Sequence, residues 1–182
     1  TLRNAEFDGA WAAGSGQFTA RPGAWLVYGI VFGMGRHPLI VLAIQAVIGI
    51  ATAVVFFRLL RRFVPVELAF AAALAWLVLP NHTSLEVWAS ATNIALSTLL
   101  VVGAALLLAR DELETPRLVA AVACLAGSAL CYEAVIPLAA AVAIGVPWLA
   151  AGRINKRAVV AAFVVLGAVA LWIVTHWKPE KH

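Results

Sequence analysis

Long apolar runs alternate with short polar clusters along the chain. A membrane-spanning helix needs about 20 predominantly apolar residues. The longer runs therefore predict spans, and they cover residues 38–57, 64–80, 93–110, 118–152 and 158–175. A shorter run at 23–35, bracketed by Arg21 and Arg36, fits a short span, a re-entrant piece or an interfacial helix.

Particular residues mark where several of these helices should begin. Pro38 suits a first helical position, and Pro116 does so after Thr115 as the N-cap. Glu67 lies near the start of the second long run, where a negative charge complements the helix dipole. These signals predict separate helices that are joined by short loops.

The run from Leu118 to Gly152 is too long for one helix and contains a single charged residue, Glu133. Basic loops favour the cytoplasmic side of a membrane. The clusters "RLLRR", "RDELETPR" and "GRINKR" share one side only if this run is a hairpin of two short helices that turns near Glu133. The turn, the loop "NHTSLEVW" and both chain ends then lie on the extracytoplasmic side.

The composition places the chain in the membrane class. Of the 182 residues 64% are hydrophobic and 12% are charged, whereas soluble domains average about 25% charged residues. The net charge of +4 comes from clusters at the ends of apolar runs, so we expect the lipid bilayer as a partner and no nucleic acid. Cys124 and Cys131 lie seven residues apart, which is about 10 Å along a helix and too far for a disulfide.

The predicted fold is all-α, a polytopic transmembrane helix bundle with about six or seven membrane helices. Residues 1–22 form an extracytoplasmic loop, residues 23–176 the transmembrane bundle, and residues 177–182 an extracytoplasmic tail or the start of a further loop. The first residues lack the basic and apolar segments of a signal peptide. We therefore expect the chain to be a fragment, preceded by a further helix.

The polar residues that are candidates for binding or catalysis all fall on the predicted outer side. They are Asp8, Arg21, Arg36, His37, His82, Glu86, Tyr132 and Glu133. A lone carboxylate at the membrane is costly and is by default a candidate for function, which makes Glu133 the strongest member. No metal-ligand spacing occurs among them, and the metal requirement stays open.

Four of the other candidates have a second interpretation. Glu86 completes a capping box that begins at Thr83, and His82 fits a solvated loop. Asp8 is either an ordinary loop acid or a general base. Arg21 is either a snorkelling membrane anchor or a phosphate ligand.

Three blocks, in order, resemble the GT-C superfamily of integral-membrane glycosyltransferases. They look like the protein O-mannosyltransferase type and the membrane mannosyltransferases that carry TPR repeats. The blocks begin with "ARPGAWLVYGIVFGMGRHPLIVLAI", "LPNHTSLEVWASATNIALSTLL" and "AGSALCYEAVIPLAA". They resemble the family's "RPL…fG…h" block, its "HPvHtEaVaW" block and its "laxLsKEtAvvlPl" block.

The resemblance implies a GT-C-like fold and transfer of a sugar from a polyprenyl-phosphate donor. The family's essential outer-loop acid would be Asp8, which acts as a base or orients the acceptor. Arg21 would lie near the phosphate, while His82, Tyr132 and Glu133 would shape the cavity, with Glu86, Arg36 and His37 as further candidates. Tyr132 replaces the family's Lys.

Two other functions remain open. A non-catalytic multispanning subunit that binds lipid or a partner protein would explain the replaced Lys, and the partner could be another subunit or the rest of the chain. A small transporter would predict inverted repeats and polar midplane residues, which the sequence lacks. We expect a multi-pass protein of the bacterial plasma (inner) membrane whose site faces outward.

Overall fold

The computed structural model describes residues 22–33, 38–78, 92–110, 113–152 and 154–176. Within these ranges the chain is all-helical, as the sequence predicts. The elements are α3 (Pro22–Gly33), α4 (Pro38–Leu60), α5 (Val66–Val78), α7 (Thr92–Leu108), α8 (Thr115–Cys131), the 3-10 turn η2 (Glu133–Val135), α9 (Ile136–Ala151) and α10 (Lys156–His176).

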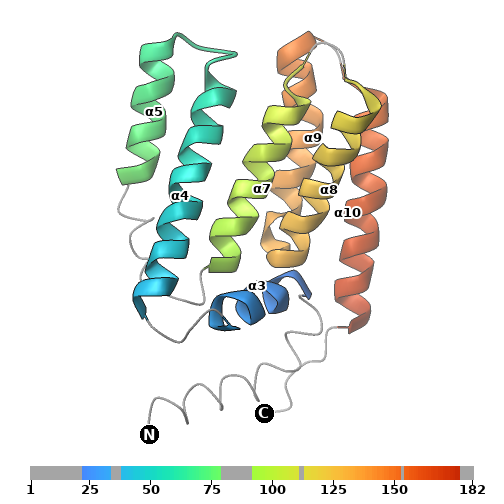
Figure 1. The fold of residues 1–182 in the computed structure, drawn as a ribbon. Coiled ribbons are helices and arrows are strands. Elements are labelled where there is room, and N and C mark those ends of the chain that lie inside the picture. The colour runs from blue at the N-terminus through green and yellow to red at the C-terminus, as the bar shows by residue number, and fades with distance from the viewer. Residues whose placement is uncertain (1–21, 34–37, 79–91, 111–112, 153, 177–182) are drawn as a thin grey trace, which may run out of the picture.

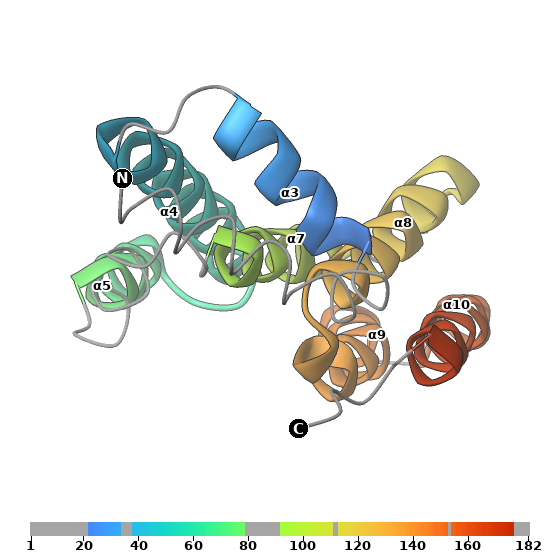
Figure 2. The same cartoon turned by 90° about the horizontal axis from the view of Figure 1, so that it is seen from below.

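Six of the helices stand side by side, and α3 lies across one end of them (Figure 1). Viewed from that end, α5, α4 and α7 follow one another in a row, and α8, α9 and α10 group beyond α7 (Figure 2). Helix α7 packs against α4, α8 and α9, so it joins the two halves of the bundle. The orientation of α3 excludes a span parallel to the other helices.

The predicted hairpin is confirmed. Helix α8 runs to Cys131, Tyr132 has extended backbone angles (φ −155°, ψ 106°), and α9 returns along the bundle after η2. Helix α9 ends at Gly152, whose φ of 64° is left-handed and whose N–H donates to the Trp148 carbonyl at 2.9 Å. Glycine adopts this conformation without a steric cost.

The basic clusters share one end of the bundle, as the loop charges predict. Arg61 follows α4, Arg110 follows α7, and Lys156 opens α10 (Figure 1). The Tyr132–Glu133 turn lies at the opposite end, beside α3 (Figure 1). We call these two ends the basic end and the turn end.

The predicted helix starts are correct at two positions and wrong by one residue at a third. Helix α4 begins at Pro38, and Glu67 lies in the first turn of α5. Helix α8 has Glu114 rather than Thr115 as its N-cap, and no side-chain hydrogen bond caps it. The backbone at Thr115 is already helical, which leaves Pro116 the second helical residue.

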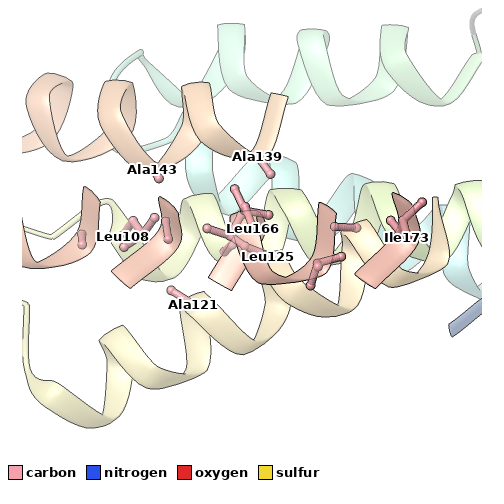
Figure 3. Close-up of a cluster of buried hydrophobic side chains, with 12 residues drawn as sticks. Leu108, Ala121, Leu125, Ala139, Ala143, Leu166 and Ile173 are labelled. Atoms are coloured by element: carbon pink, nitrogen blue, oxygen red, sulfur yellow. The ribbon is translucent and has the colours of Figure 1, made fainter. Parts of the chain in front are cut away.

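Small side chains form most of the core. The largest buried cluster joins α7, α8, α9 and α10 (Figure 3), and alanines such as Ala121, Ala139 and Ala143 interleave there with Leu108, Leu125 and Leu166. Apolar lipid offers no hydrophobic drive for helix association, so close van der Waals packing between small residues has to hold such helices together.

Among the described residues, three helices are long and apolar enough to cross a membrane, namely Leu39–Leu60, Glu133–Ala151 and Lys156–His176. Helices α5, α7 and α8 are apolar but shorter. Large apolar side chains on the outer surface, including Val47, Leu68 and Val174, are exposed. Apolar surface of this extent fits contact with lipid, and the chain has the character of a membrane protein.

Candidate functional site

The candidate site lies at the turn end, where the α8–α9 hairpin reverses. The N–H of Tyr132 donates to the Ser128 carbonyl (2.9 Å), which is the last helical bond of α8. The Tyr132 carbonyl accepts from the Val135 N–H (3.2 Å), which is the first bond of the turn. The backbone therefore leaves α8 and enters η2 at Glu133. Pro137 then occupies the first turn of α9.

The Glu133 side chain is half-buried, and its Oε2 atom is enclosed by protein. Tyr132 is half-buried as well. Two neighbouring polar side chains are thus positioned at one reversal of the chain. The reversal places Glu133 at the end of the bundle rather than at its middle (Figure 1).

Buried polar side chains of α4 and α7 occupy the same end. The Gln45 amide donates from Nε2 to Thr92 Oγ1 at 3.1 Å, which links α4 to the start of α7. The Asn93 amide donates from Nδ2 to the Cys131 carbonyl at 3.2 Å, directly before the turn. All three side chains are almost fully buried.

The Asn93 amide also has an acceptor atom that faces the interior. Its Oδ1 is buried and accepts no hydrogen bond from any residue in the described part of the chain. A buried acceptor of this kind is costly unless a donor reaches it. Nδ2 of the same amide bonds to Cys131, the residue directly before the Tyr132–Glu133 break.

A second pair of polar residues continues this network into the bundle. Ser97 Oγ donates to the Ser128 carbonyl at 2.9 Å, and Ser128 Oγ donates to the Leu125 carbonyl at 2.7 Å. Asn93 and Ser97 are four residues apart and so lie on the same face of α7, towards α8. The bonds from Asn93 and Ser97 hold α8, the helix that leads to the Glu133 turn, in a fixed rotation.

Helix α3 covers this end. A side-chain carbon at Gly23 would lie 2.8 Å from the Leu130 carbonyl carbon, so only glycine allows α3 to approach α8 this closely. Further along α3, Val27 packs with Val41 of α4 and with Cys131. Cys131 and Cys124 are both free thiols, as their spacing predicts.

Most of the sequence-predicted site residues fall elsewhere in the chain. Tyr132 and Glu133 lie together in the hairpin turn. The other candidates lie outside the described residues, and they are Asp8, Arg21, Arg36, His37, His82 and Glu86. Their convergence with Glu133 stays a prediction. In the described part of the chain, no group of three or more His, Cys, Asp or Glu side chains could hold a metal ion.

Sequence reasoning missed the polar network of Gln45, Thr92, Asn93, Ser97 and Ser128. All five lie inside or at the edge of an apolar run. The signal that was available is the i, i+4 spacing of Asn93 and Ser97, which predicts one polar face on an otherwise apolar helix.

Comparison of the chain with protein-family models, with curated proteins and with solved structures finds no match. The candidate site is therefore defined by its own geometry. It consists of a helix break at Tyr132–Glu133, the buried amides of Gln45 and Asn93, and the covering helix α3.

Proposed function

We propose that this chain is a multi-pass membrane glycosyltransferase, or part of one, that transfers a sugar from a polyprenyl-phosphate donor on the extracytoplasmic side. The observation that carries the proposal is the position of the Glu133 carboxyl, at a helix break opposite the basic end. By the basic-loop rule the turn end faces outward. A polar substrate on the outer side therefore reaches this carboxyl without crossing the hydrocarbon core of the membrane.

The chemistry of the reaction suits the groups at this end. Transfer of a sugar from a phosphate requires an acceptor that is oriented and deprotonated, and a departing phosphate whose charge is stabilised. In this proposal Asp8 orients or deprotonates the acceptor, and Arg21 holds the phosphate. The Glu133 carboxyl accepts hydrogen bonds from sugar hydroxyls, which are donors.

The test is a transfer assay with the full-length protein in native-like membranes and a radiolabelled polyprenyl-phosphate sugar. Asp8→Asn should lower the rate about 100-fold or more, because a general base contributes about 10²–10⁴-fold. Glu133→Gln should lower it about 10- to 100-fold, as expected when a group that positions substrate is lost. Glu67→Gln is the matched control, since Glu67 is an exposed glutamate of α5 near the basic end.

Either of two results would overturn the proposal. Wild-type membranes that transfer no sugar from any polyprenyl-phosphate donor would remove the activity. Full activity of both Asp8→Asn and Glu133→Gln, in protein that is still inserted, would remove the site.

A non-catalytic membrane subunit is the second candidate, and the polar network favours it. The Gln45 amide donates to Thr92 and the Ser97 hydroxyl donates to the Ser128 carbonyl, so both bonds join helices rather than face a ligand. In that case Glu133→Gln would leave transfer unchanged but reduce the amount of partner protein that co-purifies from crosslinked membranes. The two measurements on the same variant separate the candidates.

A further inference from the structure

A pocket with a volume of about 350 Å³ opens at the basic end, far from the turn. Its lining residues come from the segments on either side of the α7–α8 connection, from the second half of α9 and from the start of α10. Its polar wall is made by Arg110, Asn155, Lys156 and Arg157, and its apolar floor includes Pro147 and Ile154.

The polar wall is strongly positive. Three of its four polar residues are cations, and none of the described residues that line the pocket is acidic. The acid at the start of α8, Glu114, already pairs with Arg117 (Oε2 to Nε, 3.7 Å). Within the described part of the chain, Arg110, Lys156 and Arg157 form no ion pair with an acidic side chain.

The fold adds to this positive potential. Lys156 and Arg157 are the first two residues of α10, a helix of 21 residues. The N-terminus of a helix carries partial positive charge, so cations placed there are unfavourable without a compensating anion. Asn155 caps α10, because its Oδ1 accepts from the Ala158 N–H at 3.2 Å. Its amide N–H₂ remains a donor for a ligand.

The orientation of a membrane protein does not require loop cations to gather around one pocket. Loop cations that set the orientation of a membrane protein act by their number and their side. Here cations from two connections, 46 residues apart in sequence at Arg110 and Lys156, line one pocket. An anion between them relieves the repulsion among the three cations and the positive end of α10.

We propose that this pocket binds a phosphate ester. Arg110, Lys156 and Arg157 hold the phosphate oxygens, and the Pro147–Ile154 floor takes the apolar part of the ester. This site is independent of the sugar-transfer proposal, because it lies at the opposite end of the bundle. The same chemistry has two sources, namely the head group of an anionic membrane lipid and a free phosphate compound.

The test is a thermal-unfolding titration of the full-length protein in neutral detergent. The separate additives are phosphatidylglycerol, phosphatidylcholine, inorganic phosphate and glycerol 3-phosphate. Phosphatidylglycerol that raises the midpoint, with no effect of the two soluble phosphates, assigns the site to a lipid head group. The reverse pattern assigns it to a free phosphate ester. A ligand that binds only the folded state raises the midpoint by mass action.

Variants of the lining residues show whether this pocket causes the rise of the unfolding midpoint. Arg110→Gln and Lys156→Gln should each weaken the apparent affinity about fivefold, the effect of about one cation near a membrane surface, and the double variant about 25-fold. Lys156→Arg should retain binding, and Arg58→Gln should too, since Arg58 is an exposed cation of α4 that does not line the pocket. All replaced side chains are exposed, so the ligand-free midpoints should agree.

Three results would overturn the proposal. No phosphate-containing additive raises the midpoint of the wild type, the double variant responds like the wild type, or Arg58→Gln weakens the affinity as much as the pocket variants do. The last result would mean that the net charge of the basic end, rather than this pocket, attracts the anion.

Discussion

Gly23 shows how one missing side chain positions a whole helix. A carbon added there would lie 2.8 Å from the carbonyl carbon of Leu130 and 2.9 Å from the carbonyl oxygen. Backbone atoms at the end of α8 cannot rotate away as the tip of a flexible side chain could. The absence of a side chain at Gly23 therefore sets how closely α3 covers the turn end.

We predict that Gly23→Ala displaces α3 and destabilises the protein by about 1–3 kcal/mol, the usual cost of overpacking. The measurement is the rate at which a maleimide labels Cys131 in a Cys124→Ser background, because Val27 of α3 packs with the Cys131 region. Labelling should accelerate in Gly23→Ala.

The control for this prediction is Gly29→Ala, in the same helix. An added carbon at Gly29 meets no atom within 4 Å, and alanine favours a helix over glycine by about 1 kcal/mol. Labelling should therefore stay slow. Equal labelling rates in the two variants would contradict the proposed role of the Gly23 contact.

At the scale of elements, the hairpin of α8 and α9 could be predicted from the sequence because the basic residues in the loops on either side indicate it. Only a reversal near Glu133 brings "RDELETPR" and "GRINKR" to one end. The orientation of α3 has no such signal, since a 12-residue apolar helix suits several positions. The bonds from Asn93 and Ser97 to α8 depend on how two helices are rotated, which the apolar pattern of α7 leaves undefined.

The contact between α7 and α8 provides a test at this scale. Ser97→Ala removes the hydroxyl that donates to the Ser128 carbonyl on the neighbouring helix, so it should destabilise the protein by about 0.5–1.5 kcal/mol. Thr98→Ser is a matched control, because the Thr98 hydroxyl donates to Ile94 within its own helix. Unfolding in a denaturing detergent measures both; equal stability of Ser97→Ala and wild type would refute the contribution of this bond.

At the scale of the molecule, the shared end of the three basic clusters leads to a prediction of orientation. Reporter fusions after Val64, Glu114 and Asn155 should place the reporter in the cytoplasm, and a fusion after Ala134 should place it outside. A phosphatase that is active only outside, paired with a fluorescent protein that matures only inside, gives the measurement. The opposite pattern at all four positions would reverse the bundle and move the candidate site to the cytoplasm.

The short length of α8 has a consequence for the bilayer around the protein. Its 17 residues extend about 26 Å, whereas hydrocarbon is about 30 Å thick and the 21 residues of α10 extend about 32 Å. In the proposed multi-pass arrangement, lipid beside α8 compresses by a few ångströms, at fractions of a kcal/mol per ångström. This hydrophobic mismatch draws the head groups and their water inward beside the end of α8, towards the Glu133 carboxyl.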